Sequence, residues 1–220
     1  MEGTMKNEAN PTPHPRFTVV GHPLLETHLT GLRDEQAPAP EFRRHLEAAA
    51  RVLAVELARD LETAPIPIRT PLEEMAGTRF RNPHILVPIL RAGLGFLNGF
   101  LEIMPWARVG HLGMARNETT LEPESYYARL PDGLEQSEVL LLDPMLATGG
   151  SASSAMAVLK KAGARRIRFC CLVAAPEGVA VLAQAHPDVP VLAGALDRQL
   201  NDKGFILPGL GDAGDRYFGT

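Results

Sequence analysis

The chain has 220 residues and a formal net charge of −4, a size that suits one domain with room for a core. This weak acidic balance disfavours nonspecific nucleic-acid binding, which draws on a basic face. No apolar run approaches the roughly 20 residues of a membrane helix. With only two cysteines, we expect a soluble cytoplasmic protein with reduced thiols.

The first sixteen residues are polar and carry Pro11, Pro13 and Pro15. They lack the apolar core of a signal peptide. We therefore predict a disordered tail over 1–16 and a single domain over 17–220.

Two helices are predicted next, a short one over Leu24–Arg33 and a longer one over Glu41–Leu61. In the longer segment, apolar residues such as Leu46 and Leu53 recur at three- and four-residue steps and form one stripe. The following Ile66–Arg69 lies among prolines and is at most a short edge strand.

From residue 85 onward the chain alternates between strand-like and helix-like segments. Strands are predicted over Ile85–Leu90, Val109–Met114, Val139–Leu142, Ile167–Ala174 and Val189–Ala195, and helices over Leu94–Met104, Ser151–Ala162 and Glu177–Ala185. This alternation predicts an α/β fold with a mainly parallel sheet covered on both faces. Ligands of such sheets gather at the carboxyl ends of the strands. Cys170 and Cys171 would point to opposite faces and so cannot pair.

One of these strand ends carries an acid and a run of small residues. Val139–Leu142 is apolar without alternation, which is typical of a strand buried on both faces. Ala147–Ser151, called here the phosphate loop, offers backbone N–H groups and a helix N-terminus to an anion. Asp143 lies five residues before Thr148, where a carboxylate would meet the sugar of a bound sugar phosphate. A tight strand-to-helix turn would need the same glycines, and that reading stays open.

Two arginines follow other strands. Arg91 opens an Ala-Gly-Leu-Gly turn and could bind paired phosphate oxygens bidentately; the alternative is an arginine that caps a turn. Arg116 begins a polar stretch that ends at Arg129. This stretch suggests a mobile flap that excludes water, with a solvated surface hairpin as the alternative.

The segment from Asp143 to Ser151 resembles the 5-phosphoribosyl-1-diphosphate (PRPP) motif of type I phosphoribosyltransferases. Pro144 in place of a second acid is similar to the uracil phosphoribosyltransferases. Four further segments resemble that family in its order, so the resemblance covers roughly Pro23 to Thr220. These segments are 87–95, 116–123, 173–178 and 207–215.

The resemblance implies the type I phosphoribosyltransferase fold and the reaction of uracil with PRPP to give UMP and diphosphate, with Mg2+ as cofactor. It implies catalytic roles for Asp143, Arg91 and Arg116. The implied PRPP contacts are Arg91, Arg116, Asp143, Pro144, Met145, Leu146, Ala147, Thr148, Gly149, Gly150, Ser151 and Asp212. The implied uracil contacts are Ile206, Gly211, Asp212 and Ala213. Asp212 would also lie near the metal, which is held mostly through PRPP and water.

The family pattern also places a flap at about 116–130 and a hood over the base at about 199–220. The glycine-rich hood is expected to be ordered by contacts rather than by regular structure. Asp212 and Asp215 could instead be ordinary turn acids, and we favour that interpretation for Asp215. The chain departs from the family at Phe205, where many members carry Tyr, and at Thr119, where an acid is common.

Two other functions stay open. A phosphoribosyltransferase for another base would share the phosphate loop but lack this hood. A regulator of the same fold that binds RNA and senses uridine nucleotides is disfavoured by the acidic charge, so no nucleic-acid partner and no membrane partner are expected. The resemblance also implies a homodimer or homotetramer, and activation by GTP is known for some members.

Overall fold

A computed structural model describes residues 14–116 and 123–220. Over these residues it contains no helix that is both long and apolar enough to cross a membrane. The prediction of a disordered tail reaching residue 16 is wrong at its end, because His14 is only 3% exposed and its Nδ1 accepts a hydrogen bond from the Arg16 amide at 3.0 Å. The rest of that predicted tail lies outside the described residues.

The central sheet has nine strands in the order β1-β11-β10-β8-β4-β6-β7, with β5 beside β4 and β9 beside β10. All of these pairs are parallel except β6 with β7. The strands are β1 (Phe17–Val19), β4 (His84–Leu90), β5 (Arg108–Val109), β6 (His111–Arg116), β7 (Pro123–Arg129), β8 (Glu138–Leu142), β9 (Met145–Leu146), β10 (Arg166–Ala174) and β11 (Val191–Leu196). The predicted parallel sheet is therefore confirmed.

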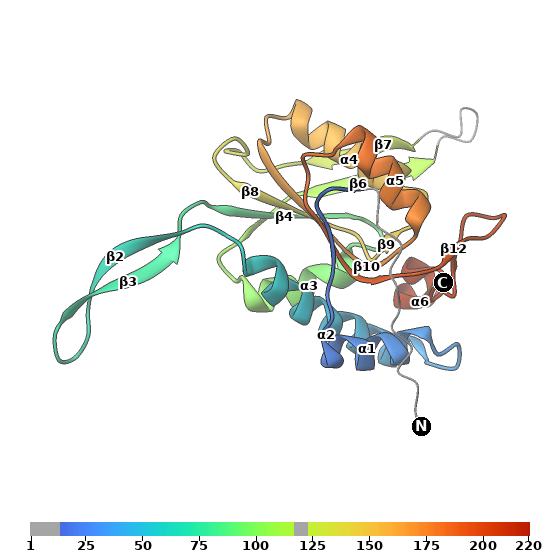
Figure 1. Cartoon of the computed structure of the whole chain (residues 1–220), viewed down its shortest axis with the longest axis horizontal. Coiled ribbons are helices and arrows are strands. Elements are labelled where there is room, and N and C mark those ends of the chain that lie inside the picture. The colour runs from blue at the N-terminus through green and yellow to red at the C-terminus, as the bar shows by residue number, and fades with distance from the viewer. Residues whose placement is uncertain (1–13, 117–122) are drawn as a thin grey trace, which may run out of the picture.

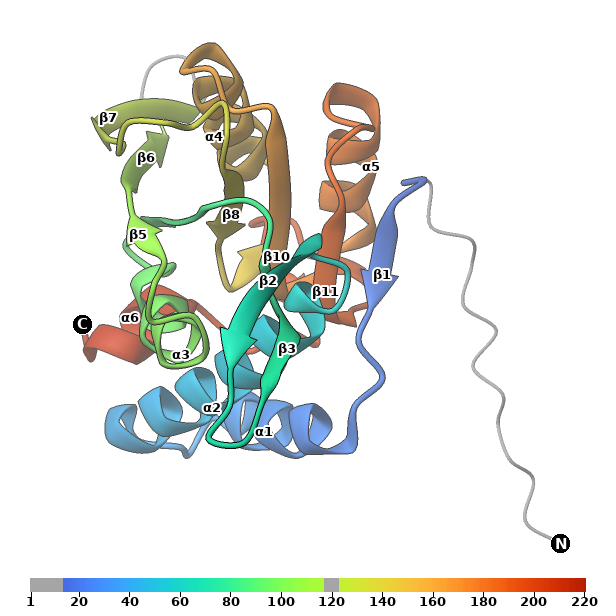
Figure 2. The ribbon, with the colours of Figure 1, turned by 90° about the vertical axis from the view of Figure 1, so that its left-hand side faces the viewer.

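Helices cover both faces of this sheet (Figures 1 and 2). One layer holds α1 (Pro23–Arg33), α2 (Ala39–Ala58) and α3 (Leu94–Ile103), and the other holds α4 (Gly150–Lys161) and α5 (Pro176–Ala185). Leu140 and Leu142 of β8 pack into the first layer, while Val139 and Leu141 pack into the second. This double burial is why β8 is apolar without alternation.

The adjacent cysteines follow the same rule. Cys170 belongs to the core on the α1–α3 side and Cys171 to the core on the α4–α5 side. Both thiols are free and buried, and burial raises the pKa of each. The predicted opposite orientation is confirmed.

Two segments differ from their predictions. The expected edge strand at Ile66–Arg69 is part of β2 (Thr63–Arg69), which pairs with β3 (Glu74–Phe80) in a two-stranded antiparallel hairpin. This hairpin, called the arm, stands apart from the central sheet (Figure 1). The hood has more regular structure than predicted: β12 (Gln199–Leu200), β13 (Ile206–Leu207) and α6 (Ala213–Phe218).

Candidate functional site

The phosphate loop is held at the carboxyl end of β8. The amide of Asp143 donates to the carbonyl of Cys170 at 3.1 Å, and β9 then continues the sheet beside β10. Gly149 precedes α4 with φ of +82°, a conformation that L residues adopt rarely. A Cβ at this position would also lie 2.9 Å from the carbonyl oxygen of Gly178. Backbone conformation and close packing therefore both require glycine here.

The hood is fixed to the body by a partly buried ion pair. The guanidinium of Arg33 in α1 contacts both carboxylate oxygens of Asp197 at 2.7 and 2.8 Å. Its Nη1 also donates to the Gly209 carbonyl at 2.8 Å, and the Gly209 amide donates to Asp197 at 2.8 Å. The turn after β13 is thus held at both its amide and its carbonyl.

Between the phosphate loop and the hood lies a cavity of about 230 Å³. It brings together residues from three places in the chain: the loop after β4, the segment after β8 and the hood. Its lining residues are Ala92, Asp143, Met145, Ala147, Gly204, Phe205, Ile206, Gly211, Asp212, Ala213 and Gly214. All four residues predicted to contact the base are among them, as are three of those predicted to contact PRPP through the strand end and loop.

Asp143 is the most perturbed acid of the cavity. Burial raises the pKa of its carboxyl to about 7, the nearby Asp212 adds to the rise, and a hydrogen bond from the Met145 amide opposes it. The residue as a whole is half-buried and lines the cavity. When the pKa of a carboxyl group is raised in this way, hydrogen-bond donors or positive charge on a ligand stabilise its ionised form.

The β12–β13 ladder does not use the backbone groups of Ile206. Ile206 lies opposite Leu200 in this ladder, next to the bond from the Asn201 amide to the Phe205 carbonyl at 2.8 Å. The Leu200 amide bonds instead to Glu177 at 2.9 Å, so Leu200 and Ile206 form a non-hydrogen-bonded pair. The amide and carbonyl of Ile206 therefore point away from β12, and its side chain is buried in the core. The carbonyl oxygen packs against Gly209, where an added Cβ would clash with it.

Several predicted contacts lie beside the cavity rather than in its wall. Thr148 sits close to the hood, because a Cβ on Gly204 would lie 3.7 Å from its methyl group. Pro144 and Leu146 are buried, and their carbonyls accept bonds from β10 and the residue after it, so they support the loop. Gly149, Gly150 and Ser151 form the first turn of α4 and its cap.

The two arginines differ in what the structure describes. Arg91 follows β4 across a cis peptide bond, and its Nη2 lies 3.0 Å from Oδ1 of Asp215. The interpretation of Asp215 as an ordinary turn acid is therefore incomplete. Arg116 ends β6, but its side chain and residues 117–122, including Thr119, lie outside what is described. The range predicted as a flap includes β7, which pairs with β6 in antiparallel fashion; the flap itself stays a prediction.

Two carboxylates are the only ionisable side chains among the described residues that line the cavity. Within residues 14–116 and 123–220, no three His, Cys, Asp or Glu side chains converge as a metal site. Asp143 and Asp212 both line the cavity, and one oxygen of Asp212 caps α6 by accepting from the Asp215 amide at 2.9 Å. This donor set fits Mg2+, which binds one or two carboxylates together with substrate phosphates.

Four lining residues were missed as contacts by the sequence argument: Ala92, Gly204, Phe205 and Gly214. Phe205, which the sequence marks only as a departure from the family pattern, lines the cavity and is 46% exposed. The signal that could have found the others is their position, each one to two residues from a predicted contact or from a glycine turn.

Comparison with known proteins shows the family of the chain. The sequence profile of the uracil phosphoribosyltransferase family matches residues 19–220. A uracil phosphoribosyltransferase from Salinibacter ruber is 53% identical over 203 residues, which cover 92% of this chain and 97% of the relative. Another from Ligilactobacillus salivarius is 47% identical over 206 residues, covering 93% and 99%.

The chain also resembles solved structures. The AQ2163 protein from Aquifex aeolicus superposes with a TM-score of 0.87 at 37% identity, over 92% of this chain and 97% of that one. A hypoxanthine-guanine phosphoribosyltransferase from Bacillus anthracis gives a TM-score of 0.51 at 13% identity, over 72% and 80%. This second likeness shows a shared fold.

Proposed function

The chain belongs to the uracil phosphoribosyltransferase family and has the type I phosphoribosyltransferase fold, and we propose that the cavity beneath the hood is where it joins uracil to the ribosyl phosphate of PRPP, giving UMP and diphosphate. The observation that carries this proposal is one juxtaposition. The strand-end acid Asp143 lines the same 230 Å³ cavity as Ile206 and Gly211–Ala213 of the hood. A sugar held by Asp143 would thus present its reacting carbon to a base held by the hood.

The phosphate loop anchors the 5-phosphate of PRPP in this proposal. Gly149, Gly150 and Ser151 present amides at the N-terminus of α4, where the helix dipole favours an anion. Asp143 binds the ribose diol and faces the ring that gains positive charge as diphosphate departs. Binding energy from the distant phosphate holds the ribose in line with the attacking nitrogen.

Arg91 and Arg116 bind the diphosphate and stabilise the charge that develops on it. Mg2+ would be held by Asp212, largely through PRPP and water, with Asp143 at hand as a second carboxylate. When bound, the ion neutralises negative charge on the leaving diphosphate. No protein nucleophile is needed.

The hood selects uracil by hydrogen-bonding pattern. Uracil presents acceptor, donor, acceptor along one edge, which a backbone row of N–H, C=O and N–H groups complements. Cytosine reverses two of these signs, so each mismatched buried group costs about 1–3 kcal/mol. The outward-facing backbone of Ile206 and the Gly211–Ala213 turn are the groups that supply this row.

A panel of bases tests the assignment. Wild-type protein with PRPP and Mg2+ is offered uracil, cytosine, hypoxanthine and orotate, with and without GTP, and diphosphate release is measured. We expect turnover with uracil alone. Turnover of a purine or orotate would favour the alternative enzyme, while no turnover together with a salt-sensitive gel shift on pyrimidine-operon leader RNA would favour the regulator.

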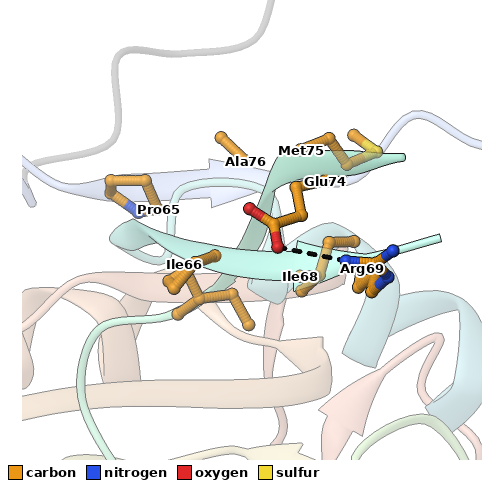
Figure 3. Close-up of a pocket in the computed structure, with 8 residues that line it drawn as sticks. Pro65, Ile66, Ile68, Arg69, Glu74, Met75 and Ala76 are labelled. Carbon is orange, nitrogen blue, oxygen red and sulfur yellow. Dashed lines mark hydrogen bonds and ion pairs between the residues drawn. The ribbon is translucent and has the colours of Figure 1, made fainter.

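The arm is where we propose that a second copy of this chain binds. A two-stranded hairpin has little stability alone, yet the arm exposes Ile68, Leu72 and Met75, with Leu72 at 93% exposure. Its apolar hollow, which Figure 3 shows, has a volume of about 700 Å³ and includes Ile66 and Ile68. An exposed apolar element of this kind is typical of an interface.

Charge indicates which surface the arm meets. Its tip carries the exposed acids Glu73 and Glu74, although Glu74 lies 3.3 Å from Arg69. Its base borders a second hollow of about 720 Å³ that holds Arg79, Arg81 and Trp106, although Arg81 lies 3.2 Å from Glu62. In a two-fold dimer, each acidic tip would enter the basic hollow of the partner. Both charged surfaces would then be paired, as a self-complementary interface requires.

A further inference from the structure

Asp215 contacts Arg91, and the proposed reaction gives this contact no role. Its Oδ1 lies 3.0 Å from Nη2 of Arg91, with the two side chains 50% and 58% exposed. The Arg91 guanidinium also lies 5.8 Å from the centre of the Phe218 ring. Two residues of α6 therefore contact one arginine from the loop after β4, whereas the sequence predicts only a turn acid at position 215.

The helix that carries Asp215 is firmly attached to the body. The Arg216 guanidinium donates to the carbonyls of Leu32 and Asp34, and it lies 4.4 Å from the Phe42 ring centre. Arg43 of α2 donates to the Tyr217 carbonyl at 2.7 Å. Because α6 is attached through the residues that follow Asp215, its carboxylate is a fixed point against which Arg91 can be oriented.

The same helical turn reaches the cavity. Asp212 lines the cavity and accepts from the Asp215 amide at 2.9 Å. Gly214 lies next to the loop after β4, since a Cβ at position 214 would lie 3.8 Å from the Cβ of Ala92. Asp212, which lines the cavity, and Asp215, which contacts Arg91, thus belong to the same helical turn.

We propose that Asp215 is a positioning residue that orients the Arg91 guanidinium to receive the diphosphate of PRPP, an inference that rests on the proposed function. The contact engages only Nη2 of Arg91, and a guanidinium has five N–H donors in a fixed fork. The remaining donors stay available to a ligand. An arginine that is already ordered loses less side-chain entropy when the diphosphate binds.

The test uses steady-state kinetics and diphosphate product inhibition. Exposed ion pairs contribute little, so Asp215→Ala should raise the KM for PRPP and the inhibition constant of diphosphate about two- to fivefold, with kcat and the KM for uracil unchanged. Asp215→Asn, which keeps an oxygen acceptor, should restore most of the loss. Asp202→Asn, at an exposed acid of the hood outside the cavity lining, is the matched control and should resemble the wild type.

A double-mutant cycle with Arg91→Gln makes the proposal falsifiable. If Asp215 acts through Arg91, adding Asp215→Ala to Arg91→Gln should change neither constant further. Additive losses, or tighter diphosphate binding in Asp215→Ala, would overturn the positioning role while leaving the function intact. If Arg91→Gln alone left the KM for PRPP unchanged, the diphosphate role of Arg91 would fall first, and the role of Asp215 with it.

Discussion

At the scale of single residues, Asp143 combines a cost in stability with its place in the reaction. Its pKa of about 7 in the folded protein exceeds that of an exposed aspartate. The folded state therefore holds the proton more tightly than the unfolded state, and stability is lost as pH rises through 7. Sites that bind charged substrates commonly carry such a cost.

We therefore expect Asp143→Asn to stabilise the protein more at pH 8 than at pH 5.5. A gain of about 1 kcal/mol would raise Tm by roughly 2–4 °C in a chain of this size. Thermal unfolding followed by calorimetry at the two pH values measures the difference. An equal change in Tm at both would contradict the raised pKa.

Phe205 is a second residue with a specific expectation. It lines the cavity, and its ring carries no hydroxyl that could bond to the base or ribose. Phe205→Tyr should lower the KM for uracil or PRPP modestly, about two- to tenfold for one added hydrogen bond. Unchanged kinetics would show that the hydroxyl has no partner here.

At the scale of elements, the phosphate loop depends on the left-handed conformation of Gly149. Gly149→Ala adds strain of about 1–3 kcal/mol and a contact at 2.9 Å with the Gly178 carbonyl, so stability should fall and the KM for PRPP should rise. Gly163 also has a positive φ, +96°, but lies after α4 with only Glu135 near its Cβ position. Gly163→Ala should therefore lower stability without changing the KM for PRPP.

The arm carries the expectation about assembly. Met75→Glu places a charge on its exposed apolar surface, where Met75 is 50% exposed, and should shift the protein toward monomer in sedimentation equilibrium. Val55 of α2 is 51% exposed, so Val55→Glu is a control for adding charge to an apolar surface residue. A monomeric wild type, or equal dissociation by both variants, would refute assembly through the arm.

At the scale of the whole molecule, the features that could be predicted from the sequence are those that a contiguous stretch of residues determines. The β8 strand, the acid after it and the phosphate loop are contiguous, and burial on both faces leaves a plain apolar signature. The β3 strand was missed because Glu74–Phe80 has neither alternation nor a core to face. Its pairing comes only from β2.

Contacts between distant segments could not be predicted in this way. The pairing of Arg91 with Asp215 spans 124 positions and that of Arg33 with Asp197 spans 164, and nothing local marks the partners. The helix α6 was hidden by glycines at its start, although Asp212 caps it as its residue type favours. The family resemblance supplied the residues of the hood, and the fold shows how they meet.

The most direct test of the central claim is conversion of radiolabelled uracil to UMP with PRPP and Mg2+, by wild-type protein and Asp143→Ala side by side. The proposed site predicts turnover by the wild type and a loss of roughly 10²-fold or more in the variant, with folding checked by Tm. Wild-type protein that binds PRPP but forms no UMP, or a variant that retains full activity, would contradict it.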